Sequence, residues 1–147
     1  MSSPAKPLAS SLPTMCWELN GRIFVIVHSK HPPADPDYDA ALNGYARHLG
    51  DFDGILISTA GGGPNFAQRK RTLDFWEGKV PPTTVVMTSL QVTRGIITAM
   101  NWFRHDSPII ATAFDDFVRA FDYLHVSPAR RTDLQTAVTR LHKAVQS

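Results

Sequence analysis

The stretch TAGGGPNFAQRKR, residues 59–71, holds the residue types best suited to binding chemistry. Gly61, Gly62 and Gly63 follow an apolar run and precede a predicted helix that opens at Asn65. Glycines let a ligand approach the main chain, and the unpaired amides and dipole at a helix N-terminus favour an anion. Arg69, with Lys70 and Arg71, adds positive charge beside the turn. The pattern allows an anion or partner site, and it also suits a plain strand-to-helix corner with a solvated basic face.

The established phosphate-binding motifs are absent from this loop. No Gly-Lys-Ser/Thr follows the glycines, as a Walker motif requires, and the dinucleotide pattern GxGxxG is missing. A second candidate pair is Ser89, expected to cap a helix, and Arg94, one and a half turns inside that helix. If the strands before the two loops are neighbours, Gly61–Asn65, Ser89 and Arg94 share the carboxyl edge of the sheet, where open α/β sheets bind ligands. The alternative is a capping serine and a surface arginine.

Histidines and hydroxyls after an apolar strand raise the question of catalysis. His28, Ser29 and His31 lie close together in the sequence. Asp35, or Asp106 of the His105-Asp106 pair, could supply the acid of a Ser-His-acid arrangement. The nucleophile-elbow pattern GxSxG is missing, and no Cys/His spacing is typical of a zinc site. We therefore predict no catalytic residue, no metal site and no cofactor.

Composition restricts the class of protein. The chain has 147 residues, 43% of them hydrophobic, which is enough for one domain with a substantial core. A net charge of +2 argues against specific nucleic-acid binding. One cysteine, Cys16, makes no internal disulfide, and the apolar runs are too short to span a bilayer. We expect a cytoplasmic protein without a transmembrane segment.

Apolar periodicity and turn residues predict the strands and helices that position these residues. Apolar and β-branched runs bounded by turn residues indicate strands at Thr14–Glu18, Arg22–His28, Asp53–Thr59, Thr83–Ser89 and Pro108–Phe114. Asn20-Gly21 is typical of a type I′ hairpin turn. Helical spacing predicts helices at Pro36–Leu49 with Asp35 as N-cap, at Asn65–Glu77, at Leu90–Arg104, after Asp115 or Asp116, and from Ser127-Pro128 onwards.

The spacing of apolar residues also predicts which helix faces are buried. The expected core positions of these helices are Tyr38, Leu42, Tyr45 and Leu49; Phe66, Leu73 and Trp76; Val92, Ile96, Ala99, Met100 and Phe103; Phe117, Ala120, Phe121 and Leu124; and Leu134, Val138, Leu141 and Val145. The last of these faces can pack on the domain or on a partner. Trp17, Trp76, Trp102 and Phe103 either belong to the core or line a groove.

The order ββαβαβαβαα predicts an α/β fold. We expect a single domain with a mixed, mostly parallel five-stranded sheet covered by helices. Residues 1–13 are rich in proline and small residues and are expected to form a disordered arm. The α/β domain is expected to span residues 14–126, followed by an extra amphipathic helix in residues 127–147.

This order and three stretches of sequence resemble the STAS-like fold of the bacterial anti-sigma-factor antagonists, in particular the variant associated with lipid binding. The stretches are ADPDYDAALNGYARHL, TTVVMTSLQVTRGIITAMNWF and IIATAFDDFVRAFDYL, within a likeness that covers about residues 15–125. In these antagonists a serine at the start of the second helix, usually after an aspartate, is phosphorylated by a partner kinase. Here GGGPN stands at that place, and Ser58 and Thr59 lie at the end of the strand before it.

Three functions follow from the residues and the resemblance. The first is a non-catalytic regulatory or scaffolding module that docks to a protein partner, with an anion or nucleotide at the glycine loop as a modulator. The second is a carrier of a small apolar or lipid-like ligand enclosed by the helices predicted at Asn65–Glu77 and Leu90–Arg104, which needs an internal apolar pocket. The third is a hydrolase or transferase at the loop edge of the sheet, which needs a nucleophile and a base within hydrogen-bond reach. The apolar stripe of the last helix also allows a homo-oligomer.

Overall fold

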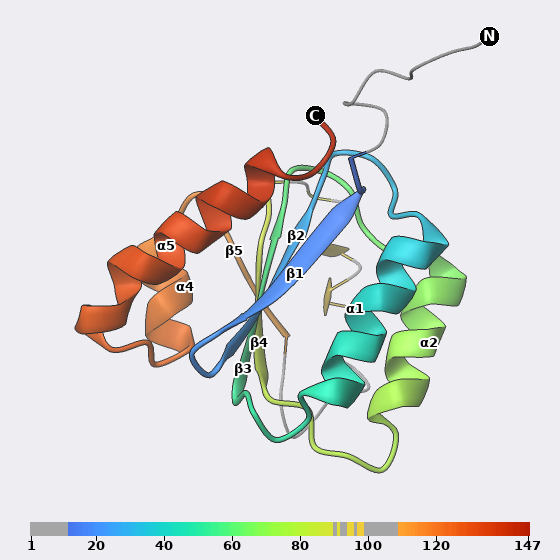
Figure 1. Cartoon of the computed structure of the whole chain (residues 1–147), viewed down its shortest axis with the longest axis horizontal. Helices are drawn as coiled ribbons and strands as arrows, with labels where there is room; N and C mark the ends of the chain where they lie inside the picture. The colour runs from blue at the N-terminus through green and yellow to red at the C-terminus, as the bar shows by residue number, and fades with distance from the viewer. Residues whose placement is uncertain (1–11, 90, 92–93, 96, 99–108) are drawn as a thin grey trace, which may run out of the picture.

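A central sheet with helices on both faces makes up the protein in a computed structural model, which describes residues 12–89, 91, 94–95, 97–98 and 109–147 (Figure 1). The strands are β1 (Met15–Asn20), β2 (Ile23–His28), β3 (Gly54–Thr59), β4 (Thr83–Met87) and β5 (Ile109–Thr112). Their spatial order follows the chain, β1-β2-β3-β4-β5. β1 pairs antiparallel with β2, and the remaining pairs are parallel. The predicted α/β class with a mixed, mostly parallel five-stranded sheet is confirmed.

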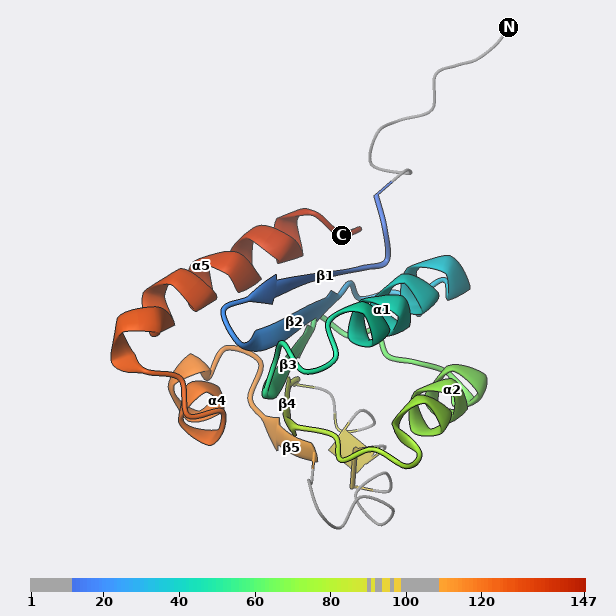
Figure 2. The same ribbon diagram turned by 60° about the horizontal axis from the view of Figure 1, so that its bottom comes forward.

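Helices α1 (Asp35–Arg47) and α2 (Phe66–Trp76) lie on one face of the sheet, and α4 (Phe117–Tyr123) and α5 (Pro128–Lys143) lie on the other (Figure 2). α1 and α2 each connect neighbouring parallel strands in the same direction along the sheet. Because such crossovers have one hand, both helices fall on the same face. Of the helix predicted at Leu90–Arg104, residues 91, 94, 95, 97 and 98 are helical, and the others, Trp102 and Phe103 included, lie outside the described residues.

Alternation along the strands gives each face its own core. Phe24, Ile26 and Ile55 face α1 and α2, where Tyr45 and Trp76 join them in one buried cluster. The intervening residues of the same strands face α4 and α5 and pack with residues such as Phe121 and Leu134. β2 is buried at every position, as its continuous apolar sequence predicts for a strand covered on both faces. The last residue of β2, His28, therefore belongs to the α1/α2 face.

The hairpin turn lies one residue later than predicted. Asn20 pairs with Ile23, so the two central turn residues are Gly21 and Arg22. Gly21 has a φ of +61°, and Arg22 has a negative φ. Glycine at the first central position with only that residue at positive φ is typical of a type II′ turn, which corrects the expected type I′ turn.

The ends of α1 and α2 account for three errors in the predictions. Ala34, and not Asp35, is the N-cap of α1, and the Asp35 carboxylate instead accepts a hydrogen bond from Gln68. Leu49, expected in the core, is 47% exposed because α1 ends at Arg47. Phe66, the first residue of α2, is 74% exposed. Helical spacing alone does not show that the first and last turns extend past the sheet they cover.

The C-terminal helix packs on this domain, which decides between the two alternatives left open by its sequence. Leu134, Val138, Leu141 and Val145 are buried against the sheet as part of the α4/α5 core. Nη2 of Arg140 donates to both oxygens of the Glu18 carboxylate on β1, and each distance is 2.9 Å. Near the end of the helix, the backbone amide of Gln146 donates to the Pro13 carbonyl, and the side-chain amide of Gln146 donates to the Leu12 carbonyl. Among the described residues, no helix is long and apolar enough to cross a bilayer.

Candidate functional site

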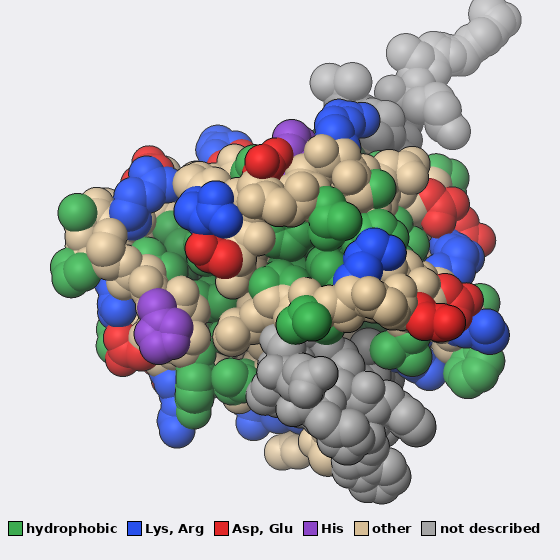
Figure 3. All heavy atoms as spheres, turned by 90° about the horizontal axis from the view of Figure 1, so that it is seen from below, with side chains coloured by type: hydrophobic (Ala, Val, Ile, Leu, Met, Phe, Trp, Pro, Cys, Tyr) green, Lys and Arg blue, Asp and Glu red, His purple; other side chains and the backbone are tan. Residues whose placement is uncertain are grey.

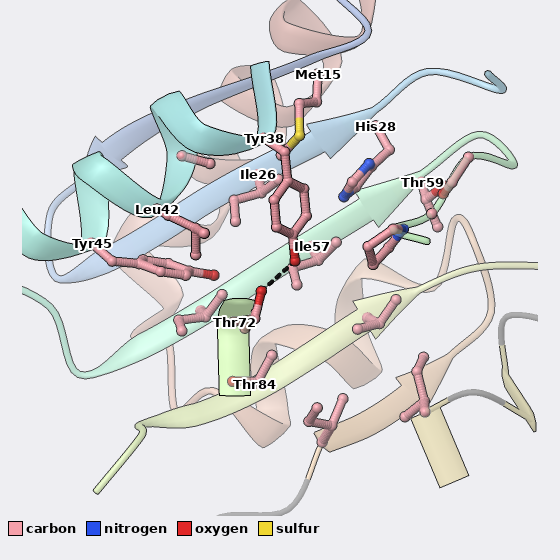
Figure 4. A pocket seen from close by; sticks show the side chains of 18 of the residues that line it. Met15, Ile26, His28, Tyr38, Leu42, Tyr45, Ile57, Thr59, Thr72 and Thr84 are labelled. Carbon is pink, nitrogen blue, oxygen red and sulfur yellow. Dashed lines mark hydrogen bonds between the residues drawn. The ribbon is translucent and has the colours of Figure 1, made fainter. Parts of the chain in front are cut away.

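A cavity of about 120 Å³ lies between the sheet and the layer formed by α1 and α2. Its walls are mostly apolar, and Figure 4 shows side chains from the helices and the strands converging on it. The lining residues are Met15, Ile26, His28, Tyr38, Ala41, Leu42, Tyr45, Ile55, Ile57, Thr59, Gly62, Gly63, Pro64, Thr72, Trp76, Thr84, Val86, Ile97 and Ile109. No Asp, Glu, Lys or Arg is among them. An apolar enclosure with a few polar groups is the ordinary composition of a small-molecule site.

His28 brings a buried polar group to this cavity. Its ring points into the cavity from the carboxyl end of β2 (Figure 4), and the residue is only 4% exposed. Nδ1 has no hydrogen-bond partner among the residues that the structure describes. Burial, and secondarily the charge of His142, lowers the pKa of His28 to about 4. The imidazole is therefore neutral at pH 7.

The hydroxyl groups around the cavity bond within the protein. Thr72 donates to the Gln68 carbonyl, so the Tyr38 hydroxyl is the donor in its own short bond to Thr72 Oγ1. The Thr59 hydroxyl donates to the Gly62 carbonyl, and that of Thr84 donates to the Pro82 carbonyl at 3.1 Å. Burial raises the pKa of Tyr38, which keeps this phenol protonated. His28 Nδ1, by contrast, has no partner among the described residues, and it has essentially no accessible surface.

The glycine loop is a tight corner that lines part of the cavity. The Gly61 amide donates to Thr59 Oγ1 at 3.0 Å, and the Gly62 amide donates to the Ser29 carbonyl at 2.8 Å. Gly61 has a φ of +145°, and a Cβ on Gly62 would lie 2.1 Å from the His31 carbonyl oxygen. Both amides thus form hydrogen bonds that hold the corner together. This arrangement supports the structural interpretation of the loop more than the anion site.

The first turn of α2 has its own cap. Asn65 accepts a bond from the Gln68 amide at 2.8 Å, and the Gln68 side chain accepts one from the Asn65 amide at 3.0 Å. The side-chain NH₂ group of the buried Gln68 donates to the Pro33 carbonyl and to the Asp35 carboxylate. Such a capping box satisfies donors that an anion would otherwise use. The predicted site residue Asn65 is therefore a structural cap that ties α2 to the start of α1.

The basic residues of α2 have partners within the protein. Arg69 donates to the Pro64 carbonyl at 2.8 Å, and its guanidinium lies 6.0 Å from the Phe66 ring centre. Arg71 contacts the carboxylates of Asp35 and Asp39, and Lys70 contacts Asp74. On the face shown in Figure 3, cationic and anionic side chains are interspersed.

Ser89 and Arg94 follow β4, the neighbour of the strand that leads into the glycine loop. The prediction of a shared site required this arrangement. β3 and β4 are neighbours in parallel, so both loops leave the same edge of the sheet. Ser89 is exposed, and Arg94 donates to the Thr88 carbonyl at 2.9 Å. Neither lines the cavity, and no contact among the described residues joins them to Gly61–Asn65. The edge is shared, but the contacts do not form one site.

A serine–histidine contact that the sequence did not indicate lies on the opposite face of the sheet. Ser58 Oγ is 2.7 Å from His142 Nε2 on α5, and the Phe114 ring packs edge-on against the imidazole. Burial lowers the pKa of His142. Ser58 is 1% exposed, so a substrate has no access to its hydroxyl, and the contact fastens α5 to β3. The two residues are separated by 84 positions, a distance that no local motif spans.

The other catalytic candidates do not form a dyad. Ser29 Oγ accepts a bond from the His31 amide at 3.1 Å, and His31 Nε2 lies 3.0 Å from the Ser147 carbonyl oxygen. Thr59 is buried and bonded within the loop, and the pair His105-Asp106 lies outside the described residues. Within the described part of the chain, no group of three His, Cys, Asp or Glu side chains could hold a metal ion.

Comparison with known proteins gives no relative. No protein-family model, curated protein or solved structure matches this chain at a significant level. The resemblance to the STAS-like fold therefore remains a sequence-based prediction, and the site has to be interpreted from its own geometry.

The sequence suggests an internal apolar pocket for a carrier, but it does not predict the position of this cavity beneath α1 and α2. In the sequence, His28 is a catalytic candidate, and the spacing of Tyr38, Leu42 and Tyr45 predicts one helix face. Alternation along β2 places His28 on the same face of the sheet as Phe24 and Ile26. Together, the strand and helix patterns predict that an imidazole faces an aromatic helix stripe. They do not show that space is left between them.

The buried imidazole predicts a pH dependence of stability. The pKa of His28 falls from 6.5 to about 4 on folding, so the unfolded chain binds more protons between these values. The contribution is fully present above pH 6.5, is lost as the pH falls toward 4, and amounts to roughly 3 kcal/mol. Urea unfolding of wild type and a His28→Gln variant from pH 7.5 to 4 measures it. The variant should lose less stability over this range; parallel curves would contradict the assignment. His142 acts in the same direction in both proteins.

Proposed function

We propose that this chain is a non-catalytic, cytoplasmic binding module that holds a small, mostly apolar molecule in the cavity beneath α1 and α2. The cavity carries this proposal: its described lining residues are mostly aliphatic and aromatic, and none of them is Asp, Glu, Lys or Arg. Burial of apolar ligand surface supplies the binding free energy, and the absence of charge disfavours ions.

The size of the cavity limits the ligand. An engineered cavity of about 150 Å³ lined by aliphatic and aromatic residues binds benzene, and the cavity here measures about 120 Å³. A single ring with at most a small substituent is therefore the expected scale. A cavity of this size favours such a molecule over a long acyl chain, so we propose a smaller ligand than the lipid-like one expected from the sequence. An affinity in the sub-millimolar to millimolar range is the expectation for about seven non-hydrogen atoms.

A cavity-blocking variant tests this function. Ala41 lines the cavity and Ala40, its neighbour on α1, is exposed. Toluene at 2 mM should raise the Tm of wild type by about 2–4 °C, because a ligand that binds only the native state stabilises it. The shift should persist in Ala40→Leu and disappear in Ala41→Leu, whose larger side chain fills the cavity. Equal shifts in both variants would place binding elsewhere, and no shift in wild type would reject the function.

A second candidate, docking to a protein partner, is favoured by one observation. Phe66 is 74% exposed at the start of α2, beside the guanidinium of Arg69. An exposed aromatic ring next to a cation is typical of the residues that anchor protein interfaces. The element order also agrees with the resemblance to the anti-sigma-factor antagonists, which act by docking. Phe66 does not line the cavity, so a Phe66→Ser variant separates the two functions: it should abolish docking and leave the toluene shift unchanged.

A further inference from the structure

The outer edge of β1 is an open side of the sheet. β1 is the first strand in the spatial order, and its sheet neighbour is β2. Figures 1 and 2 show β1 between α5 and α1, with no described helix or strand along its outer side. Every residue of the strand after Met15 is only half-buried. An open strand edge of this kind is a template for pairing with another extended chain.

The hydrogen bonds to β2 show which backbone groups of β1 point outward. The Ser29 amide donates to the Thr14 carbonyl at 2.9 Å, and Asn20 pairs with Ile23 across the hairpin turn. Because bonding alternates along antiparallel strands, every second residue from Thr14 to Asn20 bonds to β2, and the residues between them direct their backbone groups outward. The main chain of these outward residues has no hydrogen-bond partner among the described residues: they are Met15, Trp17 and Leu19.

β1 lacks the features that protect an edge strand from such pairing. Proline, lysine and β-bulges are the usual protection of natural sheet edges. The register with β2 runs from Met15 to Asn20 without a bulge, and the sequence MCWELN contains no proline or lysine. The charged side chain of this strand, Glu18, is paired with Arg140 at 2.9 Å. The edge is therefore open to a second strand.

The outward residues are self-complementary about Trp17. When two copies of β1 run antiparallel with Trp17 opposite itself, Met15 of each copy lies opposite Leu19 of the other. Each of these facing pairs exchanges two hydrogen bonds, so every outward amide and carbonyl meets a partner. The contact uses the same surface on both copies, as a two-fold dimer requires. A second copy of this chain therefore satisfies the whole edge.

The charged side chains agree with this register. It places Glu18 of one copy opposite Cys16 of the other, and Cys16 Sγ lies 3.9 Å from the Ala144 carbonyl oxygen at the end of α5. Lys143, the preceding residue, is exposed and has no ion pair with a described residue. It shares a helix face with Arg140, three residues earlier, which already reaches β1. The Glu18 carboxylate is thus brought to the free ammonium group of the second copy, an attractive cross-strand arrangement.

We propose that β1 pairs with β1 of a second copy of this chain, antiparallel and centred on Trp17, so that the two sheets become one continuous sheet across a two-fold axis. The apolar stripe of α5 is buried within each copy. The homo-oligomer therefore forms through the sheet edge and not through that stripe. This interface goes beyond the proposed ligand binding, because it needs no ligand.

The mass of the protein in solution, from light scattering after size-exclusion chromatography, tests the interface. At roughly 100 µM, wild type should have twice the mass of the chain, since a micromolar Kd leaves most of it dimeric. Leu19→Pro should be monomeric, because proline removes an outward amide and no bond to β2. The matched variant Leu19→Val keeps the amide and should remain dimeric.

The charge of Lys143 tests the orientation of the two copies. Lys143→Glu should weaken the dimer by about tenfold, because a carboxylate then faces Glu18 of the other copy. Lys143→Arg keeps the positive charge and should leave the Kd unchanged. A dilution series followed by analytical ultracentrifugation gives both values. Equal Kd values for the two variants would contradict the proposed register.

A disulfide tests the register directly. Glu18→Cys places a thiol opposite Cys16 of the other copy, where facing Cα atoms lie about 4.5 Å apart, within the range that a disulfide spans. Mild oxidation should link this variant into covalent dimers. Asn20→Cys has its thiol two residues further along the same face of the strand, out of register with Cys16, and should stay unlinked.

Each outcome decides for or against this interface. A wild type that is monomeric at every concentration overturns the proposal and leaves the edge to a different extended chain. A dimer that persists in Leu19→Pro, or equal linking of the two cysteine variants, places the interface elsewhere. If Leu19→Pro does not fold, the exposed Lys143 variants and the disulfide decide instead.

Discussion

Replacing Gly62 with alanine should destabilise the protein by about 3 kcal/mol or more, the largest effect that we expect from adding a single methyl group. The Cβ would lie 2.1 Å from the His31 carbonyl oxygen and 2.6 Å from the Ser29 carbonyl oxygen. Both contacts are with backbone, so no side chain can rotate away. The loop must move, and the bond from the Gly62 amide to Ser29 is then lost. Total stabilities are commonly 5–15 kcal/mol, so this loss is a large share.

The adjacent glycine is the matched control for this prediction. A Cβ on Gly63 would meet no atom within 4 Å, and this residue does not have a positive φ. Gly63→Ala should therefore be neutral or stabilise by about 0.4–1 kcal/mol, because it restricts the unfolded chain. Urea denaturation measures both variants. If Gly62→Ala and Gly63→Ala had the same stability, the corner interpretation of the glycine loop would be wrong.

Replacing Leu134 with alanine should cost about 2–5 kcal/mol in the free energy of unfolding. This α5 side chain is 1% exposed and belongs to the core beneath α4 and α5, so its removal leaves a cavity there. The prediction tests whether residues 127–147 unfold together with the sheet. Two-state urea unfolding, followed by circular dichroism and by tryptophan fluorescence, gives the free energy from both signals.

Gln135, the next residue of α5, is exposed and serves as the control. Gln135→Ala should change stability by no more than about 0.5 kcal/mol. If Leu134→Ala matched it, or if the two signals separated into two transitions, α5 would not be an integral part of the core.

The predictions from sequence succeed where the pattern is long and local. The continuous apolar run of β2 and the spacing of Leu134, Val138 and Leu141 both predict burial that the structure confirms. They fail at element ends, as for Leu49 and Phe66, because exposure there depends on how far a helix extends past the sheet.

The candidate site was harder to predict for the same physical reason. The glycine loop stands out in the sequence, but its amides bond to Thr59 and Ser29, and a partner 33 residues away, Ser29, does not appear in any local motif. The cavity depends on packing gaps between α1, α2 and the sheet, which composition and periodicity do not encode. The sequence shows that a histidine ends this strand. Only the three-dimensional structure shows that His28 is buried and that its Nδ1 has no partner among the described residues.

Methyl NMR of isoleucine gives the most direct test of the cavity as a ligand site. The isoleucines that the structure describes divide between the two faces of the sheet, which provides an internal control. Those that line the cavity are Ile26, Ile55, Ile57, Ile97 and Ile109. Ile23 and Ile110 pack in the core on the opposite face of the sheet. On titration with toluene, the δ1-methyl signals of the cavity set should shift and saturate together, while those of Ile23 and Ile110 stay in place. Unchanged spectra, or equal shifts in both sets, would contradict a binding site at this cavity.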